Sequence, residues 1–264
     1  MSDDPNQMIL TDAHCHLQDP AFVSDISEVI KRATLFGIRH FAVNGTSPAD
    51  WSQLAELANK TPEVIPLFGV HPWKVEERSE NGEEHLKAML IRFPKAGIGE
   101  IGLDGLLTDA PMDLQVQVFR QQLKISRQFK RPCTIHAVKA WSQLLPVLKE
   151  SPPPKFLLHS FGGSAEQVGT FLKWEAYFSF GGAVIRHSNS QKVKEALQTV
   201  PADRLLLETD APFQHPEGKD HRQEPAGLLK IAEAVAEVRG EPIEDLLKNC
   251  EENAKNFFEV PIRF

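Results

Sequence analysis

The chain has few cysteines, and none of them stands in a pattern that binds zinc or builds a disulfide framework. Cys15, Cys133 and Cys250 are an odd number, have no Cys-x-x-Cys spacing and lie among apolar neighbours. Disulfide frameworks and cysteine zinc sites both rest on paired cysteines. We therefore expect three reduced thiols that pack in the interior and take no part in chemistry.

Long apolar runs and an excess of basic residues are also missing. No run of about 18 apolar residues occurs, and residues 1–7 are polar and acidic, so the sequence predicts neither a membrane span nor a secretory signal. The cytoplasm is the expected location. With 36 acidic against 29 basic residues and a net charge of −7, the chain lacks a broad basic footprint for nucleic acid. A polyanionic substrate would then be held locally, by bound cations and a few basic residues.

Apolar runs of strand length alternate with longer stretches of helical periodicity. The predicted strands cover residues 8–13, 38–44, 63–70, 96–102, 132–136, 155–159, 176–181 and 204–208. Helices are predicted at 24–36, 111–130, 140–149, 164–173, 189–199 and 225–239, with one or two more in the tail 242–259. Such alternation is typical of β-α-β units, and eight parallel strands close a barrel of about 250 residues. We predict an α/β fold, a TIM (β/α)8 barrel, as a single domain over residues 1–264 with extra C-terminal helices.

Histidines and carboxylates stand at the downstream ends of these apolar runs. In a parallel barrel the carboxyl ends of all strands meet at one rim, where active sites lie. The pattern predicts that these side chains converge and hold divalent cations, which need several nitrogen and oxygen donors. It favours a metal-dependent hydrolase. The residues are His14, His16, His71, Glu100, His136, His159, Glu208 and Asp210.

Some of these residues also have a plain structural interpretation. In a strand, His14 and His16 point to one face about 6.6 Å apart along the backbone, but an isolated pair of this spacing also arises by chance. Glu100 could be a surface glutamate before a turn, and Glu208 and Asp210 could pair with an arginine. A buried carboxylate without a cation is costly, so the whole set favours the metal site.

Six motifs follow one another between residue 9 and about residue 258. They are Asp12-Ala13-His14-Cys15-His16-Leu17, Gly69-Val70-His71-Pro72, Gly99-Glu100-Ile101-Gly102-Leu103-Asp104, Arg131-Pro132 through His136, Leu158-His159-Ser160-Phe161 and Leu207-Glu208-Thr209-Asp210-Ala211-Pro212. In this order they resemble the TatD-type metal-dependent deoxyribonucleases, which belong to the amidohydrolase-like superfamily. The ending Glu252-Asn253-Ala254-Lys255-Asn256-Phe257-Phe258 is similar to the family's C-terminal helix.

The resemblance implies a site for two divalent metal ions, Mg or Mn, with Zn possible. By the resemblance, the first ion is held by His14, His16 and Asp210. The second is held by His136 and His159, and Glu100 bridges the two. It also implies that nucleic acid is the substrate. We expect a monomer.

The resemblance assigns further roles around the two ions. Glu208 and Asp12 would support the ligands, and His71 and Lys74 would face the substrate phosphate. In a two-metal hydrolysis the ions activate water, Asp210 accepts its proton, and His71 helps to stabilise charge on the phosphoryl oxygens. Asp210, Glu100 and His71 are therefore the expected catalytic residues.

The chain departs from the family pattern at three places, none of them a predicted ligand. Gly105 stands where an aromatic residue is usual, Ala137-Val138 where an arginine is common, and Gln223-Glu224-Pro225 where Asn-Glu-Pro is expected. The leading hypothesis is a phosphodiesterase that acts as a 3′–5′ exodeoxyribonuclease on DNA ends. One alternative is a D-aminoacyl-tRNA deacylase or another ester hydrolase that uses the same site. Another is a binding partner in nucleic-acid processing that catalyses nothing.

A few remaining residues have two interpretations each. Trp73 could stack on a base or pack at the rim, and Arg186 and Arg222 could contact phosphates or lie in solvent. The other histidines are expected at surface or capping positions, and they are His40, His85, His187, His215 and His221.

Overall fold

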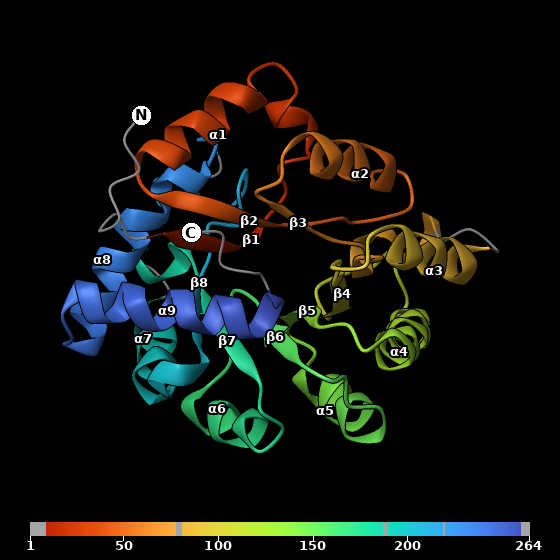
Figure 1. The fold of residues 1–264 in the computed structure, drawn as a ribbon. Helices are drawn as coiled ribbons and strands as arrows, with labels where there is room; N and C mark the ends of the chain where they lie inside the picture. The colour runs from red at the N-terminus through yellow and green to blue at the C-terminus, as the bar shows by residue number, and fades with distance from the viewer. Residues whose placement is uncertain (1–8, 78–80, 187–189, 219, 260–264) are drawn as a thin grey trace.

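The computed structural model describes residues 9–77, 81–186, 190–218 and 220–259. In these ranges strands and helices alternate along the chain, with the strands at the centre and the helices around them (Figure 1). The strands are β1 (Leu10–Cys15), β2 (Ile38–Asn44), β3 (Val64–Leu67), β4 (Ile98–Asp104), β5 (Cys133–Val138), β6 (Phe156–Leu158), β7 (Tyr177–Phe180) and β8 (Leu205–Leu207). The helices are α1 (Ile26–Leu35), α2 (Trp51–Lys60), α3 (Gly82–Arg92), α4 (Met112–Phe129), α5 (Trp141–Glu150), α6 (Ala165–Leu172), α7 (Ser190–Thr199), α8 (Leu228–Arg239) and α9 (Ile243–Phe258).

The strands form two parallel sheets, β1-β2-β3 and β4-β5-β6-β7-β8, which together close a ring. Between β3 and β4, the backbone N–H of Gly99 donates to the carbonyl of Phe68 at 3.2 Å. Between β8 and β1, the N–H of Asp210 donates to the carbonyl of His14 at 2.9 Å. The predicted (β/α)8 barrel is confirmed.

Two glycines make the seam between β3 and β4 possible. A Cβ atom on Gly69 would lie 2.7 Å from the carbonyl carbon of Gly99, and a Cβ atom on Gly99 would collide with Oδ1 of Asn44. Real Cβ atoms do not come this close to other atoms, so neither position accepts a side chain. The backbones therefore approach closely, and Glu100 on β4 comes within reach of His71, which follows β3.

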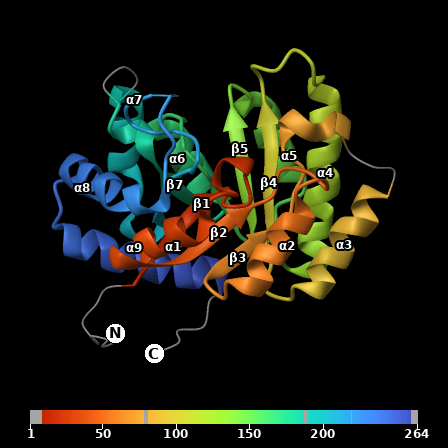
Figure 2. The ribbon, with the colours of Figure 1, turned by 90° about the horizontal axis from the view of Figure 1, so that it is seen from above.

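Helix α9 covers the end of the barrel at which the strands begin. In Figure 2 the arrowheads of β4 and β5 point away from α9. Ala254, Phe257 and Phe258 of α9 share one buried cluster with side chains of the barrel interior, namely Ala13, Ala42, Ile65, Leu67, Leu157, Tyr177 and Leu206. The amino end of the barrel is thus packed with apolar side chains.

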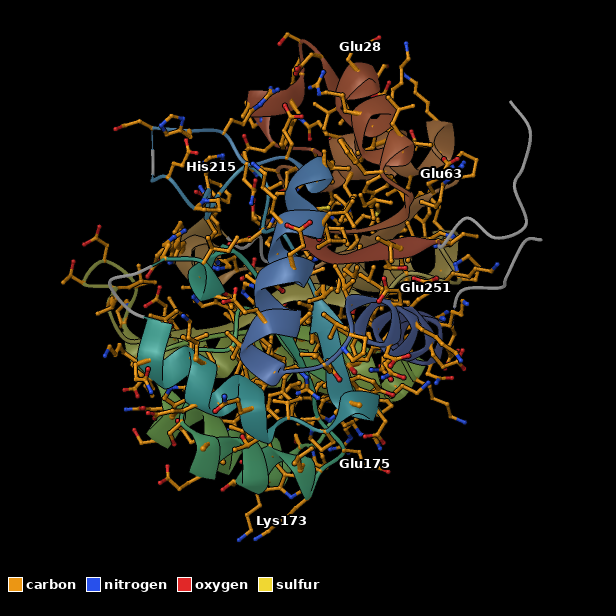
Figure 3. All side chains as sticks on the ribbon, turned by 90° about the vertical axis from the view of Figure 1, so that its left-hand side faces the viewer. Glu28, Glu63, Lys173, Glu175, His215 and Glu251 are labelled. Atoms are coloured by element: carbon orange, nitrogen blue, oxygen red, sulfur yellow. The ribbon has the colours of Figure 1, made fainter. Side chains whose placement is uncertain are left out.

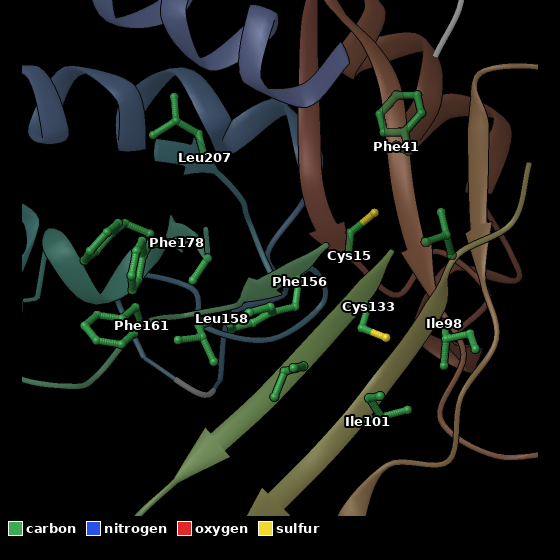
Figure 4. Packing of buried hydrophobic residues seen from close by; sticks show 14 of the residues in the cluster. Cys15, Phe41, Ile98, Ile101, Cys133, Phe156, Leu158, Phe161, Phe178 and Leu207 are labelled. Atoms are coloured by element: carbon green, nitrogen blue, oxygen red, sulfur yellow. The ribbon is translucent and has the colours of Figure 1, made fainter. Parts of the chain in front are cut away.

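A larger apolar cluster fills the layer between the strands and the outer helices. Figure 4 shows part of it, with the ring of Phe161 beside that of Phe178 and with Cys15 and Cys133 in the same cluster. All three cysteines are buried and free, which confirms their expected packing role. Among the described helices, none is long and apolar enough to cross a membrane.

The prediction was less accurate about element boundaries and about two helices. The strand predicted at 8–13 is β1, which runs to Cys15, while Met8 lies outside the described residues. The strand predicted at 63–70 ends at Leu67. Helices α2 and α3 were not predicted, residues 225–239 divide into a short 3-10 turn and α8, and the tail forms α9.

Candidate metal centre

The predicted ligands come together at the carboxyl end of the barrel. His14, Glu100 and His136 lie on β1, β4 and β5, while His16, His159 and Asp210 follow β1, β6 and β8. A cavity of about 880 Å³ opens there, and its lining includes His16, His71, Glu100, His136, His159 and Asp210. His14 is fully buried beside them.

Glu100 stands at the centre of this group. Its Oε1 atom lies 2.7 Å from Nε2 of His159, 2.8 Å from Nδ1 of His136 and 3.2 Å from Nε2 of His71. Its Oε2 atom lies 3.3 Å from Nε2 of His14 and 3.3 Å from Nε2 of His16. Each carboxylate oxygen therefore faces a different set of imidazoles.

Asp210 completes one of the two sets. Its Oδ1 atom lies 3.5 Å from Nε2 of His14 and 3.4 Å from Nε2 of His16. Its Oδ2 atom accepts a hydrogen bond of 2.7 Å from Nε2 of Gln214. The first donor set is thus His14, His16, Asp210 and one oxygen of Glu100.

The two imidazoles of this set suit a cation between them. Nδ1 of His16 lies 2.8 Å from the carbonyl oxygen of Asn44, which only accepts, so Nδ1 donates there and Nε2 is the ring nitrogen left for the site. Nε2 lies 3.1 Å from Nε2 of His14, and it can bind a cation in exchange for its own proton. Two ring nitrogens and two carboxylates that converge in this way fit a divalent metal ion, and a backbone carbonyl on the second ring nitrogen is the usual support of a histidine ligand.

His71 has the opposite arrangement. The backbone N–H of Trp73 donates to its Nδ1 at 3.1 Å, so the proton of the neutral ring sits on Nε2. Burial lowers the pKa of His71 to about 4, which keeps the ring neutral at pH 7. Gln122 of α4 holds the preceding residue in place, because its amide accepts from the N–H of Val70 at 2.7 Å and donates to its carbonyl at 3.1 Å. His71 is therefore placed as a hydrogen-bond donor.

The two predicted supporting carboxylates make different contacts. Oε1 of Glu208 lies 3.5 Å from Nδ1 of His159, the ring nitrogen that faces away from Glu100, and Ser179 donates to its Oε2. Asp12 accepts from the backbone N–H of Thr209 at 2.9 Å and from its hydroxyl at 2.5 Å. Glu208 thus contacts a ligand ring, whereas Asp12 joins β1 to the loop that carries Asp210.

The charges in this cluster favour a cation. Burial alone would raise the pKa of Glu100, but the surrounding histidines, among them His159 and His71, hold it well below its ordinary value. Burial alone would lower the pKa of His16, but Asp210 and Glu100 outweigh it and raise that pKa to about 10. Two ionised and buried carboxylates therefore stabilise positive charge at this point.

The basic residues near the cavity differ in what they already contact. Nζ of Lys74 lies 2.7 Å from Oε1 of Glu77, so its charge is paired. Arg222 pairs with Asp25 at 2.7 Å and with Glu224 at 2.6 Å, which makes it a structural residue. Arg186 lines the cavity, and its buried Nε atom has no hydrogen-bond partner within the described part of the chain.

Sequence reasoning missed two residues of the site. Asp104 ends β4, and its Oδ2 atom accepts from Nε1 of Trp73 at 2.8 Å and lies 3.5 Å from Nε2 of His136. Gln214 bonds to Asp210 from the following loop. Asp104 carries the same signal as the other residues, a carboxylate at the end of an apolar run, whereas Gln214 carries none.

Two of the histidines that were expected at surface or capping positions, His215 and His221, line the cavity, while His187 lies outside the described residues. His215, Glu217 and His221 bring their nitrogen and oxygen atoms within 4.8 Å of one another. Glu217 and His221 are exposed. Figure 3 shows His215 on a loop far from α9, which carries Glu251.

Comparison with known proteins places the chain in a family. Residues 11–259 match the model of the TatD-related DNases. The chain is 31% identical over 255 residues to YabD of Bacillus subtilis, an uncharacterized metal-dependent hydrolase, with 96% of this chain and 100% of that protein covered. It is 31% identical over 258 residues to the 3′-5′ ssDNA/RNA exonuclease TatD of Erwinia billingiae, with 95% and 99% covered.

The fold leads to the same family. The crystal structure of YjjV, a TatD homologue from Escherichia coli, superposes with a TM-score of 0.90 at 28% identity and covers 96% of this chain and 98% of its own. The chain belongs to the TatD-related DNase family and is a metal-dependent hydrolase.

Proposed function

We propose that the chain is a phosphodiesterase that removes nucleotides from the 3′ ends of DNA, with two divalent metal ions in its site. The observation that carries this proposal is the division of donors by Glu100, whose two carboxylate oxygens face two different sets of imidazoles. A carboxylate that bridges two ions has this arrangement. The TatD relative of Erwinia billingiae, a 3′-5′ ssDNA/RNA exonuclease, supports the choice of nucleic acid as substrate and of the 3′ end as the point of attack.

The residues divide into ligands of two ions. His14, His16 and Asp210 would hold one ion, His136 and His159 the other, and Glu100 would bridge them. Two such ions lower the pKa of a water molecule and offset charge on phosphoryl oxygens. We favour Mg or Mn, because three carboxylate oxygens face the site, both oxygens of Glu100 and Oδ1 of Asp210, while the imidazoles also suit Zn.

The remaining roles belong to the side chains themselves. Asp210 would accept the proton of the attacking water, since its Oδ1 atom faces the first donor set and its Oδ2 atom is held by Gln214. His71 would donate from Nε2 to a phosphoryl oxygen, because its Nδ1 atom is occupied by the Trp73 N–H. Lys74 and Arg186 both line the cavity, and Arg186, whose Nε atom has no partner among the described residues, is the better candidate for a second phosphate contact.

The proposal extends to the location and the oligomeric state of the chain. We place the chain in the cytoplasm as a monomer, and three buried free thiols support a reducing compartment.

The test is a panel of substrates with a Glu100→Gln variant. Purified protein is given 3′-labelled single-stranded DNA, RNA and D-aminoacyl-tRNA in Mg or Mn buffer, and product release is measured. We expect nucleotide release from DNA by the wild type, a loss of more than about 100-fold in Glu100→Gln, and loss on chelation of the metal. Circular dichroism is the control that checks whether the variant is folded.

Two results would redirect the proposal. Hydrolysis of D-aminoacyl-tRNA while DNA survives would assign the site to carboxyl esters. Failure on all three substrates with metal bound would favour a partner in nucleic-acid processing that catalyses nothing.

A further inference from the structure

Trp73 is a large apolar residue that lines the cavity and is mostly exposed to solvent. Its side chain is 59% exposed and lines the same cavity as Glu100 and His136. Trp51, by contrast, is 1% exposed. Packing at a rim does not require a tryptophan to expose more than half of its surface, and a ligand that covered the indole would remove this apolar area from water.

The indole of Trp73 is held in one orientation. Its Nε1–H donates to Oδ2 of Asp104 at 2.8 Å, and its ring meets the rings of His71 and His136 edge to face at 5.0 and 6.5 Å. The backbone N–H of Trp73 is bound to Nδ1 of His71. Because these contacts fix the side chain before a ligand arrives, little conformational entropy is lost on binding.

A second exposed aromatic ring lies on the other side of Glu100. Phe213 is 49% exposed, lines the cavity and meets the ring of His16 at 5.7 Å. His16 faces Oε2 of Glu100, whereas His71 and His136, the neighbours of Trp73, face Oε1. The two exposed rings thus border the two opposite donor sets of the candidate metal centre.

We propose that Trp73 is a stacking platform for a nucleobase next to the scissile phosphate, with Phe213 contacting the base on the other side. The inference rests on the proposed function, because a phosphate between the two donor sets places its two nucleosides toward these two rings. Every base has a π face, so stacking gives affinity without sequence preference. It suits a chain of net charge −7, in which acidic residues outnumber basic ones, because stacking does not depend on attraction between the chain's net charge and the phosphate backbone. A base that stacks on Trp73 has left its duplex, so the platform selects unpaired ends.

The experiment compares two oligonucleotides that differ in their terminal bases. One is single-stranded oligothymidine, and the other carries abasic nucleotides on both sides of the 3′-terminal phosphodiester, so that sugar and phosphate remain. For Trp73→Ala we expect kcat/KM on oligothymidine to fall roughly 5- to 150-fold, mainly through KM, which corresponds to about 1–3 kcal/mol for one stacked base. Trp73→Phe should keep most of the wild-type kcat/KM on oligothymidine. On the abasic substrate the wild type and Trp73→Ala should have equal kcat/KM.

Leu106→Ala is the matched control. Leu106 is 67% exposed and its N–H also bonds to Asp104, but it does not line the cavity. In this variant kcat/KM should be unchanged on both substrates. If Trp73→Ala lowers activity equally on both substrates, the ring acts through Asp104 and His136, and the platform is refuted.

A binding measurement separates this proposal from the proposed function. Quenching of tryptophan fluorescence by each oligonucleotide is measured in the wild type and in Trp73→Phe. If the wild type cleaves neither oligonucleotide but oligothymidine quenches Trp73 and the abasic oligonucleotide does not, the phosphodiesterase fails and the platform stands. Equal quenching by both, or quenching that persists in Trp73→Phe, overturns the platform.

Discussion

At the two ends of the barrel, the pKa of a buried glutamate is shifted in opposite directions. At the carboxyl end, Glu100 is 3% exposed and meets five imidazoles, which hold its pKa well below the ordinary value. At the amino end, Glu251 of α9 is 6% exposed, and burial raises its pKa to about 7, although a hydrogen bond of 2.9 Å from the Thr11 hydroxyl lowers it. Burial is the same at both ends, and the surrounding side chains decide the charge.

This difference separates a site from a structural position. A carboxylate that stays ionised in the interior needs positive charge beside it, and at the carboxyl end that charge comes from imidazoles or from metal ions. At the amino end Oε2 of Glu251 accepts from the Thr11 hydroxyl, while Oε1 lies 4.0 Å from Nδ1 of His40 and has no hydrogen-bond partner among the described residues. The comparison predicts that changes at Glu100 affect metal binding and that changes at Glu251 affect stability.

The largest expected effect is the loss of metal-linked stability at the carboxyl end. A ligand that binds the folded state at 100 times its Kd adds about 2.7 kcal/mol to stability, so Mn or Zn should raise the melting temperature of the wild type. Glu100→Ala should abolish most of this rise. Thermal unfolding with added metal and with chelator measures it, and Glu251→Gln serves as the control that keeps the full rise. A rise that survives in Glu100→Ala would place the metal elsewhere.

A smaller effect is expected at the support of one ligand. Oε1 of Glu208 lies 3.5 Å from Nδ1 of His159, and loss of such an outer carboxylate typically costs about 10- to 100-fold in metal affinity or activity. Glu208→Gln should therefore weaken metal binding or turnover by this amount, which titration calorimetry and the nuclease assay measure. Glu56→Gln, on the outside of α2, is the control with unchanged values. No loss in Glu208→Gln would show that His159 is oriented without this contact.

The positions of the site residues could be predicted because their signal is local. Each predicted ligand ends or follows an apolar run, and parallel strands bring those ends to one rim. The eight strands were found for the same reason, since their buried residues are contiguous in the sequence. Asp104 follows the same rule and could have been included.

Other features depend on contacts between distant residues. Residues 68–70 continue the apolar run of β3, yet the strand ends at Leu67, because Gln122 of α4 takes both backbone hydrogen bonds of Val70. The contacts of Trp73 with Asp104 and of Gln214 with Asp210 have no periodic signal either. Helices α2 and α3 bury three residues each, as many as α5, which was predicted, so their apolar stripe was present in the sequence and was overlooked.

The smallest predicted change is one of stability alone, at Glu251. Its pKa is about 7 in the folded chain and 4.5 ordinarily, so the folded state binds the proton more tightly than the unfolded state. Its contribution is therefore fully present below pH 4.5 and is lost as the pH rises through 7, by at most about 3 kcal/mol. Glu251→Gln, which cannot ionise, should be more stable than the wild type at pH 8 and equal to it at pH 4.5.

Urea unfolding of both proteins at pH 4.5, 6, 7 and 8 measures this difference. His40, whose Nδ1 atom lies 4.0 Å from Oε1 of Glu251, does not imitate it, because burial lowers the pKa of His40 and keeps the ring neutral above pH 7. Lys255 and Glu252 are the other charged residues that act on Glu251, and both proteins contain them. Nuclease activity at pH 7 should be the same in both. A stability difference that does not vary with pH would mean that Glu251 is ionised like Glu100, and the contrast between the two ends of the barrel would fail.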